Sequence, residues 1–107
     1  MWYIFPQLAG LGHSSTAQYF AVRSIEEARA YLDHPVLGPR YRECVEALQD
    51  LSSSNPAAVF GEVDAMKLRS SLTLFELAKP SPLFAAAIDR WFGGGRDGKT
   101  LRLLGRT

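Results

Sequence analysis

The sequence contains few of the residues that build disulfides and metal centres. It has one cysteine, Cys44, and two histidines, His13 and His34. A single cysteine excludes an internal disulfide, and these side chains do not make up the four ligands of a structural zinc site. We therefore expect no metal and no cofactor, and we expect a reducing compartment, the cytoplasm, as the location.

The sequence also lacks a charge excess and a long apolar run. Its 12 basic and 11 acidic side chains give a net charge of +1, which disfavours nucleic acid as a partner and leaves open only a local basic patch. No segment approaches the roughly 20 apolar residues of a membrane helix, so no membrane partner is expected. The apolar start, residues 2–5, ends at Pro6 without a basic residue ahead of it, which is not the form of a signal peptide.

What is present is an ordinary globular composition. Hydrophobic residues make up 47% and charged residues 21% of the 107 residues. A chain of this length is large enough for one hydrophobic core and too short for two. We therefore expect a single domain over residues 1–107.

Proline and glycine residues divide the chain into short helical segments. No segment shows the alternation of apolar and polar residues that is typical of a half-buried strand. The aromatic segment Trp2–Phe5 is expected to be a short buried strand or an extended part of the core, because Pro6 stops any regular continuation. Helices are expected at residues 15–22, after Ser24, from Pro39, from Asp64 to Pro80, from Pro82 to Gly93 and at 100–104. A single helical turn is expected at 57–60. The prediction is a mainly α fold of about five or six short helices.

Three helix starts carry capping signals. Ser24 and Glu27 form the pattern S-x-x-E, in which each side chain accepts a backbone N–H at the start of the helix. Asp64 is expected to cap the helix that follows it. Ser81 with Pro82 is expected to start the next one, because serine caps helices and proline fits their first turn.

The helix after Asp64 is expected to have one apolar and one polar face. Three residues would face the core: Leu68, Leu72 and Phe75. On the opposite side Lys67, Ser70 and Ser71 lie at spacings i, i+3 and i+4. They are expected either to be solvated or to converge on an anion or a sugar hydroxyl.

The segment Gly93–Thr100 matches G-x-x-x-x-G-K-[ST], the phosphate-binding loop of nucleoside triphosphatases. That loop follows a buried strand and precedes a full helix, whereas here an amphipathic helix precedes it and seven residues follow it. A glycine-rich helix stop is the interpretation that fits this context. A weaker interpretation stays open, in which the backbone N–H groups of the loop bind a phosphate or diphosphate.

Two further residues have both a structural and a chemical interpretation. His34 precedes Pro35 in a turn, where an imidazole caps a helix or, given a nucleophile or a water beside it, acts as a general base. Cys44 falls on the apolar face of its helix, which favours a buried, inert thiol over a nucleophile.

Several motifs follow one another along nearly the whole chain: Trp2–Leu8 with Gly10–Gly12, Glu27–Leu32 with His34–Pro35, Leu37–Gly38 with Arg40, Phe60–Gly61, Asp64, Lys67–Leu68, Ser70–Ser71 and Thr73–Phe75. By these motifs the chain resembles the bacterial family of the domain of unknown function 1810. The resemblance implies a mainly α-helical fold and no established activity. It also implies that the first helix usual in the family is missing, either because the start was assigned to an internal methionine or because the protein is a short form. In a short form, apolar surface left uncovered would support self-association.

A more distant resemblance is to the NADAR proteins, helical domains tied to the chemistry of NAD and ADP-ribose. Short matches occur in a similar order: Ser15 with Tyr19–Phe20, Leu37–Gly38 with Arg40, Lys67, and Asp89 with Trp91 and the loop Gly93–Gly98. The acidic residue that this group carries beside its early aromatic pair has no counterpart, because Ala17 and Gln18 stand there.

Two hypotheses follow from these patterns. The first is a NADAR-like domain that binds an ADP-ribose- or nucleotide-type ligand and, in an enzymatic form, cleaves an N-glycosidic bond. Its expected residues are Lys67 as the catalytic group nearest the sugar, Arg40 with Gly94, Gly95 and Gly98 on the diphosphate, Trp2 or Trp91 on the base, and Ser70, Ser71 and Asp89 as further ligand-binding residues. The second is a non-enzymatic helical interaction or stress-associated module whose polar faces are only surface.

Overall fold

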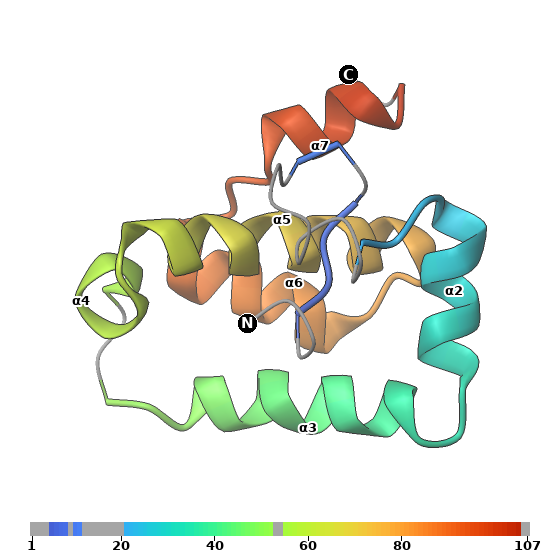
Figure 1. Cartoon of the computed structure of the whole chain (residues 1–107). Coiled ribbons are helices and arrows are strands. Elements are labelled where there is room, and N and C mark those ends of the chain that lie inside the picture. The colour runs from blue at the N-terminus through green and yellow to red at the C-terminus, as the bar shows by residue number, and fades with distance from the viewer. Residues whose placement is uncertain (1–4, 9, 12–20, 53–54, 106–107) are drawn as a thin grey trace.

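Helix α5, Glu62–Ala78, is the centre of the fold (Figure 1). It packs against α2, α4, α6 and α7, and α3 packs against α2 and α6. The arrangement comes from a computed structural model, which describes residues 5–8, 10–11, 21–52 and 55–105. Because α5 has neighbours on several sides, it buries most of its residues from Leu68 onward.

The other helices are short, as the breaker residues predicted. They are α2 Ile25–Asp33, α3 Leu37–Gln49, α4 Pro56–Phe60, α6 Pro82–Phe92 and α7 Gly98–Leu103. No strand occurs among the described residues, where the β-type pairing consists of an isolated parallel bridge between Leu8 and Val22. The prediction of a mainly α fold is confirmed.

The N-terminal segment crosses α5 in an extended conformation and adds apolar side chains to the core (Figure 1). Phe5 and Leu8 are 6% and 4% exposed, and the N–H of Val22 donates to the carbonyl oxygen of Gln7 at 2.8 Å. Most of the expected aromatic strand and of the expected first helix lies outside the described residues. Ala21 and Val22 are not helical, so the prediction of a helix reaching Val22 is wrong at that end.

The capping signals of α2 and α6 operate nearly as predicted. The hydroxyl of Ser24 accepts the N–H of Glu27 at 3.0 Å, and the carboxylate of Glu27 accepts the N–H of Arg23, one residue earlier than the pattern requires. The hydroxyl of Ser81 accepts the N–H of Leu83, and α6 ends at Gly93 in the left-handed conformation, φ 62°. These ends are set by local hydrogen bonds, which is why the sequence reveals them.

Three helix starts differ from the prediction, and one of them is α7, which begins at Gly98 rather than at residue 100. Asp64 does not cap α5, because the helix already begins at Glu62, directly after Gly61. Gly61 has a φ of 78°, a conformation that glycine adopts without strain, and it lets the chain turn sharply from α4 into α5. Helix α3 begins at Leu37, where Nδ1 of His34 accepts the N–H groups of Val36 and Leu37 at 3.1 and 3.2 Å. His34 is therefore a capping residue.

The polar face expected on α5 is not a surface. Ser70 is 2% exposed and Ser71 is fully buried, so the prediction that both lie opposite the core is wrong. Helices and the N-terminal segment pack on both sides of α5, and small side chains such as serine let neighbouring elements approach closely. Periodicity alone identifies one buried face and does not reveal a second.

The core is built around the ring of Tyr41 on α3. Its ring centroid lies 4.4 Å from Phe75, 5.5 Å from Phe84 and 5.6 Å from Phe5, in tilted and edge-on arrangements that aromatic rings favour. Cys44, one turn further along α3, packs against this core but is only partly buried, less than the sequence predicted.

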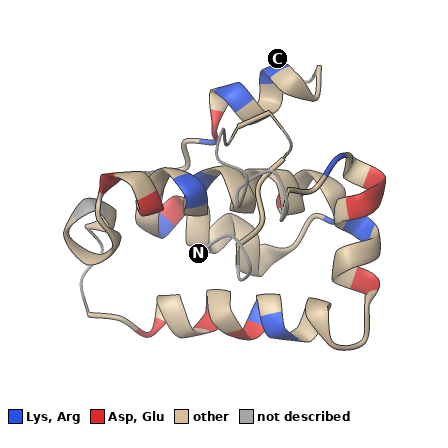
Figure 2. Cartoon of the chain, in the orientation of Figure 1, with Lys and Arg blue, Asp and Glu red and all other residues tan. Residues whose placement is uncertain are grey.

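Acidic and basic residues are interspersed along α2, α3 and α5 rather than sorted onto faces of one sign (Figure 2). Among the described residues, no helix combines the length and the apolar character that crossing a membrane requires.

Candidate ligand site

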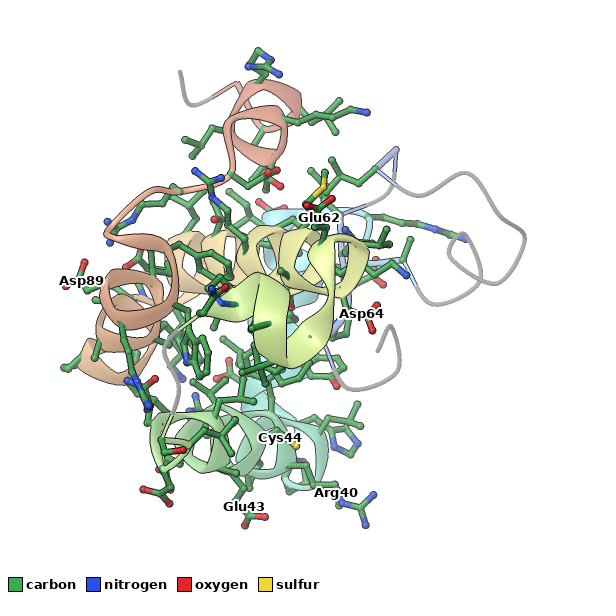
Figure 3. The ribbon with its side chains drawn as sticks, turned by 90° about the vertical axis from the view of Figure 1, so that its left-hand side faces the viewer. Arg40, Glu43, Cys44, Glu62, Asp64 and Asp89 are labelled. Atoms are coloured by element: carbon green, nitrogen blue, oxygen red, sulfur yellow. The ribbon has the colours of Figure 1, made fainter. Side chains whose placement is uncertain are left out.

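The residues that the sequence suggested for a ligand site do not surround one pocket. Arg40 is exposed on α3, Asp89 is exposed on α6, and the two lie on different sides of the molecule (Figure 3). Ser71 is fully buried between α3 and α5, where its hydroxyl shares a hydrogen bond of 3.0 Å with the phenol of Tyr41. The fold thus separates Arg40, Ser71 and Asp89.

The glycine loop between α6 and α7 uses its own N–H groups within the fold. Those of Gly93, Gly94 and Gly95 donate to carbonyl oxygens of α6, and that of Asp97 donates to the hydroxyl of Thr73 at 2.9 Å. The carboxylate of Asp97 then accepts the N–H and the hydroxyl of Thr100 at 2.9 and 2.7 Å. A negative charge therefore occupies the start of α7, where a phosphate-binding loop would present free N–H groups.

Hydrogen bonds of two arginines hold the same loop against α5. Arg69 donates to the carbonyl oxygens of Gly95 at 2.7 Å and Arg96 at 3.2 Å. Arg96 in turn donates to both carboxylate oxygens of Glu76 at 2.9 and 2.8 Å. The loop is a structural connection from α6 to α7 that is held against α5, in line with the glycine-rich helix stop that its sequence context favoured.

Trp91 is not exposed for stacking on a planar base. It is 3% exposed, its ring lies 5.1 Å from that of Phe60, and the guanidinium of Arg90 lies 5.0 Å from its centroid. Arg90 also donates to the carbonyl oxygens of Leu48, Gln49 and Leu51 at the end of α3. Trp2, the other tryptophan proposed for this role, lies outside the described residues.

One group of polar residues does come together, where the N-terminal segment crosses α5. We call Gln7, Asp64, Lys67 and Ser70 the Lys67 cluster. The amide of Gln7 donates to the hydroxyl of Ser70 at 2.7 Å, and that hydroxyl donates to the carbonyl oxygen of Lys67 at 3.0 Å. The ammonium of Lys67 lies 3.6 Å from the carboxylate of Asp64, and their side chains are 17% and 43% exposed.

The sequence suggested half of this cluster. Lys67 and Ser70 were candidates, whereas Asp64 was interpreted as a helix cap and Gln7 was not considered. No local pattern links Gln7 to Ser70, because 63 positions separate them and only the crossing of two segments brings them together. For Asp64 a signal existed, since positions i and i+3 of one helix are neighbours.

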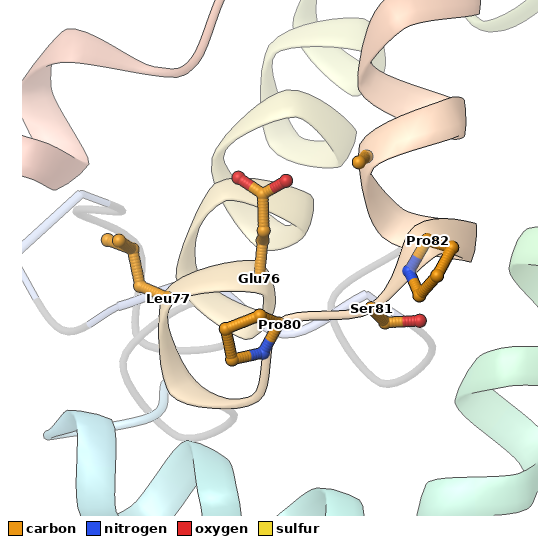
Figure 4. A pocket seen from close by; sticks show the side chains of 6 residues that line it. Glu76, Leu77, Pro80, Ser81 and Pro82 are labelled. Carbon is orange, nitrogen blue, oxygen red and sulfur yellow. The ribbon is translucent and has the colours of Figure 1, made fainter.

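Two grooves elsewhere offer less polar chemistry. One of about 500 Å³ lies at the turn from α5 to α6 and is lined by Glu76, Leu77, Pro80, Ser81, Pro82 and Ala85 (Figure 4). The carboxylate of Glu76 in this groove is already paired with Arg96. A second, of about 340 Å³, is lined by Pro56, Glu62, Ala65, Met66, Arg69 and Phe92, and its arginine is held by the glycine loop. In the described part of the chain, no three potential metal ligands gather.

The comparisons with known proteins agree with the motifs read from the sequence. The model of the family described as protein of unknown function DUF1810 matches residues 1–104, and the chain belongs to this family. The crystal structure of the conserved hypothetical protein Rv1873 from Mycobacterium tuberculosis is similar, with 42% sequence identity and a TM-score of 0.94 over 99% of this chain and 76% of that chain. No curated protein sequence matches. The resemblance to NADAR proteins has no counterpart in these matches.

Proposed function

We propose that this domain binds the sugar-bearing part of an ADP-ribose- or nucleotide-type ligand at the Lys67 cluster. The observation that carries the proposal is the lysine side chain itself, which is only 17% exposed and lies beside the carboxylate of Asp64. Lysine is almost never fully buried unless its charge is paired, because removing an ammonium from water is costly, and here the partly covered ammonium has a carboxylate as its neighbour.

The donors and acceptors of the cluster suit a ligand with hydroxyl groups. Lys67 provides donors, Asp64 provides acceptors, and a sugar hydroxyl acts as both. Ser70 and Gln7 hold each other by a hydrogen bond, which keeps the N-terminal segment against α5 beside the charged pair. The proposed site is smaller than the one suggested by the sequence, because Arg40, Ser71 and Trp91 play no part in it.

Calorimetric titration with ADP-ribose, NAD and nucleotides tests the proposal. We expect binding that Lys67→Gln weakens by at least about tenfold, since a hydrogen bond to a charged group contributes about 1.5–3 kcal/mol. Lys67→Arg should retain part of it. Lys79→Gln is the matched control, because it removes an exposed lysine paired with Asp33 at 2.5 Å on another part of the surface. The absence of both binding heat and a thermal shift at millimolar ligand would contradict the proposal.

Cleavage of the N-glycosidic bond is the enzymatic form of the same proposal. Water would add to the anomeric carbon while the carbon–nitrogen bond breaks and the base leaves with the electron pair of that bond. A guanine-type leaving group would take up a proton, whereas nicotinamide leaves NAD as a neutral molecule without one. Such reactions use a carboxylate to accept the proton of the water, and Asp64 provides one beside Lys67. Chromatographic detection of nicotinamide released from NAD, or of guanosine released from ADP-ribosylated guanosine, would support catalysis, and intact substrate would restrict the site to binding.

An interaction module is the second candidate, favoured by a different observation. Val63 and Met66 on α5 are each 66% exposed, and Val59 on α4 is 39% exposed. Val63 and Met66 are neighbours at positions i and i+3 of one helix, and contiguous exposed apolar side chains mark contacts with another protein. Sedimentation velocity at rising concentration tests self-association, and a monomer throughout the range counts against it.

A further inference from the structure

We infer that the ligand of the Lys67 cluster presents a neutral vicinal diol, as the ribose of a nucleoside does, and carries no phosphate at this site. The inference rests on the proposed function and narrows the class of ligand. Its basis is the placement of Asp64, a carboxylate that the sequence assigned to helix capping and that the structure places 3.6 Å from the ammonium of Lys67.

The charge of the pair argues against a phosphate. Lys67 and Asp64 together carry no net charge, and a phosphate approaching the ammonium would also approach the carboxylate. Sites for phosphate and diphosphate gather several cationic or backbone N–H donors. A lysine paired with a carboxylate does not provide the excess of positive charge that such a site needs.

Among the described residues, the nearest arginine of α5 and the groups that the sequence suggested for a diphosphate are engaged elsewhere or lie apart from the cluster. The guanidinium of Arg69, two residues along α5, donates to the carbonyl oxygens of Gly95 and Arg96. Arg40 is exposed on α3 and points away from the body of the molecule (Figure 3). The N–H groups of Gly93, Gly94 and Gly95 are bonded to α6, and Asp97 places its own carboxylate at the start of α7.

A diol matches the same pair of side chains. A carboxylate accepts two hydrogen bonds side by side, and an acidic residue recognises the ribose hydroxyls in this way in dinucleotide-binding proteins. Asp64 is 43% exposed and so accessible to a ligand, while the ammonium of Lys67 can donate to a third oxygen of the sugar. Ser70 is 2% exposed and its hydroxyl is engaged with Gln7 and the carbonyl of Lys67, so it positions the segment rather than contacting the sugar.

The test compares ligands that differ in one group. The four common ribonucleosides, their 2′-deoxy and 2′,3′-dideoxy forms, their 5′-monophosphates and ADP-ribose are titrated by calorimetry into the whole chain. We expect at least one ribonucleoside to bind, its 2′,3′-dideoxy form to bind at least about tenfold more weakly, and its monophosphate to bind no more tightly.

Two variants separate a diol site from its alternatives. Asp64→Asn should weaken the ribonucleoside to the level of its dideoxy form. Glu62→Gln is the control, because it removes the other carboxylate of the first turn of α5 and leaves the Asp64–Lys67 pair in place. Thermal unfolding of each variant shows whether the fold is kept, and Asp64→Glu, which keeps the carboxylate, should restore part of the diol preference if Asp64→Asn is unstable.

The outcomes distinguish failure of the inference from failure of the proposed function. If phosphate-bearing ligands bind at least tenfold more tightly than nucleosides, or if Asp64→Asn strengthens their binding, the site is an anion site and the diol inference is overturned while ligand binding stands. If neither nucleosides nor ADP-ribose bind, both are overturned.

Discussion

The phenol of Tyr41 and the hydroxyl of Ser71 share a hydrogen bond of 3.0 Å while both residues are almost completely buried, at 1% and 0% exposed. The bond joins α3 to α5 across a core of aromatic rings. It satisfies two hydroxyl groups that have no access to water, so each depends on the other.

We expect Tyr41→Phe and Ser71→Ala each to lower the free energy of unfolding by about 1–3 kcal/mol, because each leaves the other hydroxyl buried without this partner. The double variant should lose less free energy of unfolding than the two single variants lose together. Urea unfolding of the four proteins measures this coupling. Strictly additive losses would show that the hydrogen bond does not link the two side chains energetically.

Alkaline pH should destabilise the fold through buried tyrosines. Burial raises the pKa of Tyr41 above its ordinary 10.0, against a smaller opposing effect of the bond to Ser71, and burial also raises the pKa of Tyr31. Because the folded pKa exceeds the unfolded one, this stabilisation is complete below the unfolded pKa and is lost as the pH rises above it. Urea midpoints at about pH 9 and about pH 11 should differ, and Tyr41→Phe should reduce the slope by up to about 1.4 kcal/mol per pH unit.

Helix α7 should depend on Thr73. Its hydroxyl donates to the carbonyl oxygen of Arg69 at 2.8 Å and accepts the N–H of Asp97 at 2.9 Å, where the chain enters α7. Thr73→Val keeps the shape and removes both bonds, so we expect a loss of about 1–3 kcal/mol. Hydrogen exchange should quicken more at the amides of α7 than at those of α2, and equal acceleration in both would argue against a local anchor.

Replacement by alanine should change the free energy of unfolding at one glycine and hardly at another. A Cβ on Gly38 would overlap the carbonyl oxygen of Leu32 at the close approach of α3 to α2, so Gly38→Ala should cost about 3 kcal/mol or more. A Cβ on Gly98 would lie 3.3 Å from the mobile end of Arg102, so Gly98→Ala should be close to neutral. Thermal unfolding of both variants decides this, and a large loss for Gly98→Ala would mean that the glycine of the loop has a role beyond helix entry.

Local signals predicted the helix ends well. Ser24 with Glu27, Ser81 with Pro82, and Gly93 act within a few residues of themselves, so their hydrogen bonds follow from the chain alone. The prediction at Asp64 failed for a local reason, because an acidic residue is as suitable within the first turn as at the cap. The sequence did not distinguish these two positions.

The candidate site was predictable only in part. Lys67 and Ser70 lie on one helix, and their neighbourhood follows from helical spacing. Their environment does not, because the amide of Gln7 reaches Ser70 from the far end of the sequence. The same limitation explains why the glycine loop, Arg40 and Trp91 looked like parts of one site although the fold separates them.

By itself the sequence determined the family, the mainly α fold and most helix boundaries, since propensities, caps and breakers act over a few residues. Only the tertiary structure decided that α5 is surrounded by its neighbours, that Ser71 is core, and that Asp64 stands beside Lys67 at a partly covered crossing. Burial depends on which segments pack together, and that is set by contacts between residues far apart in the chain.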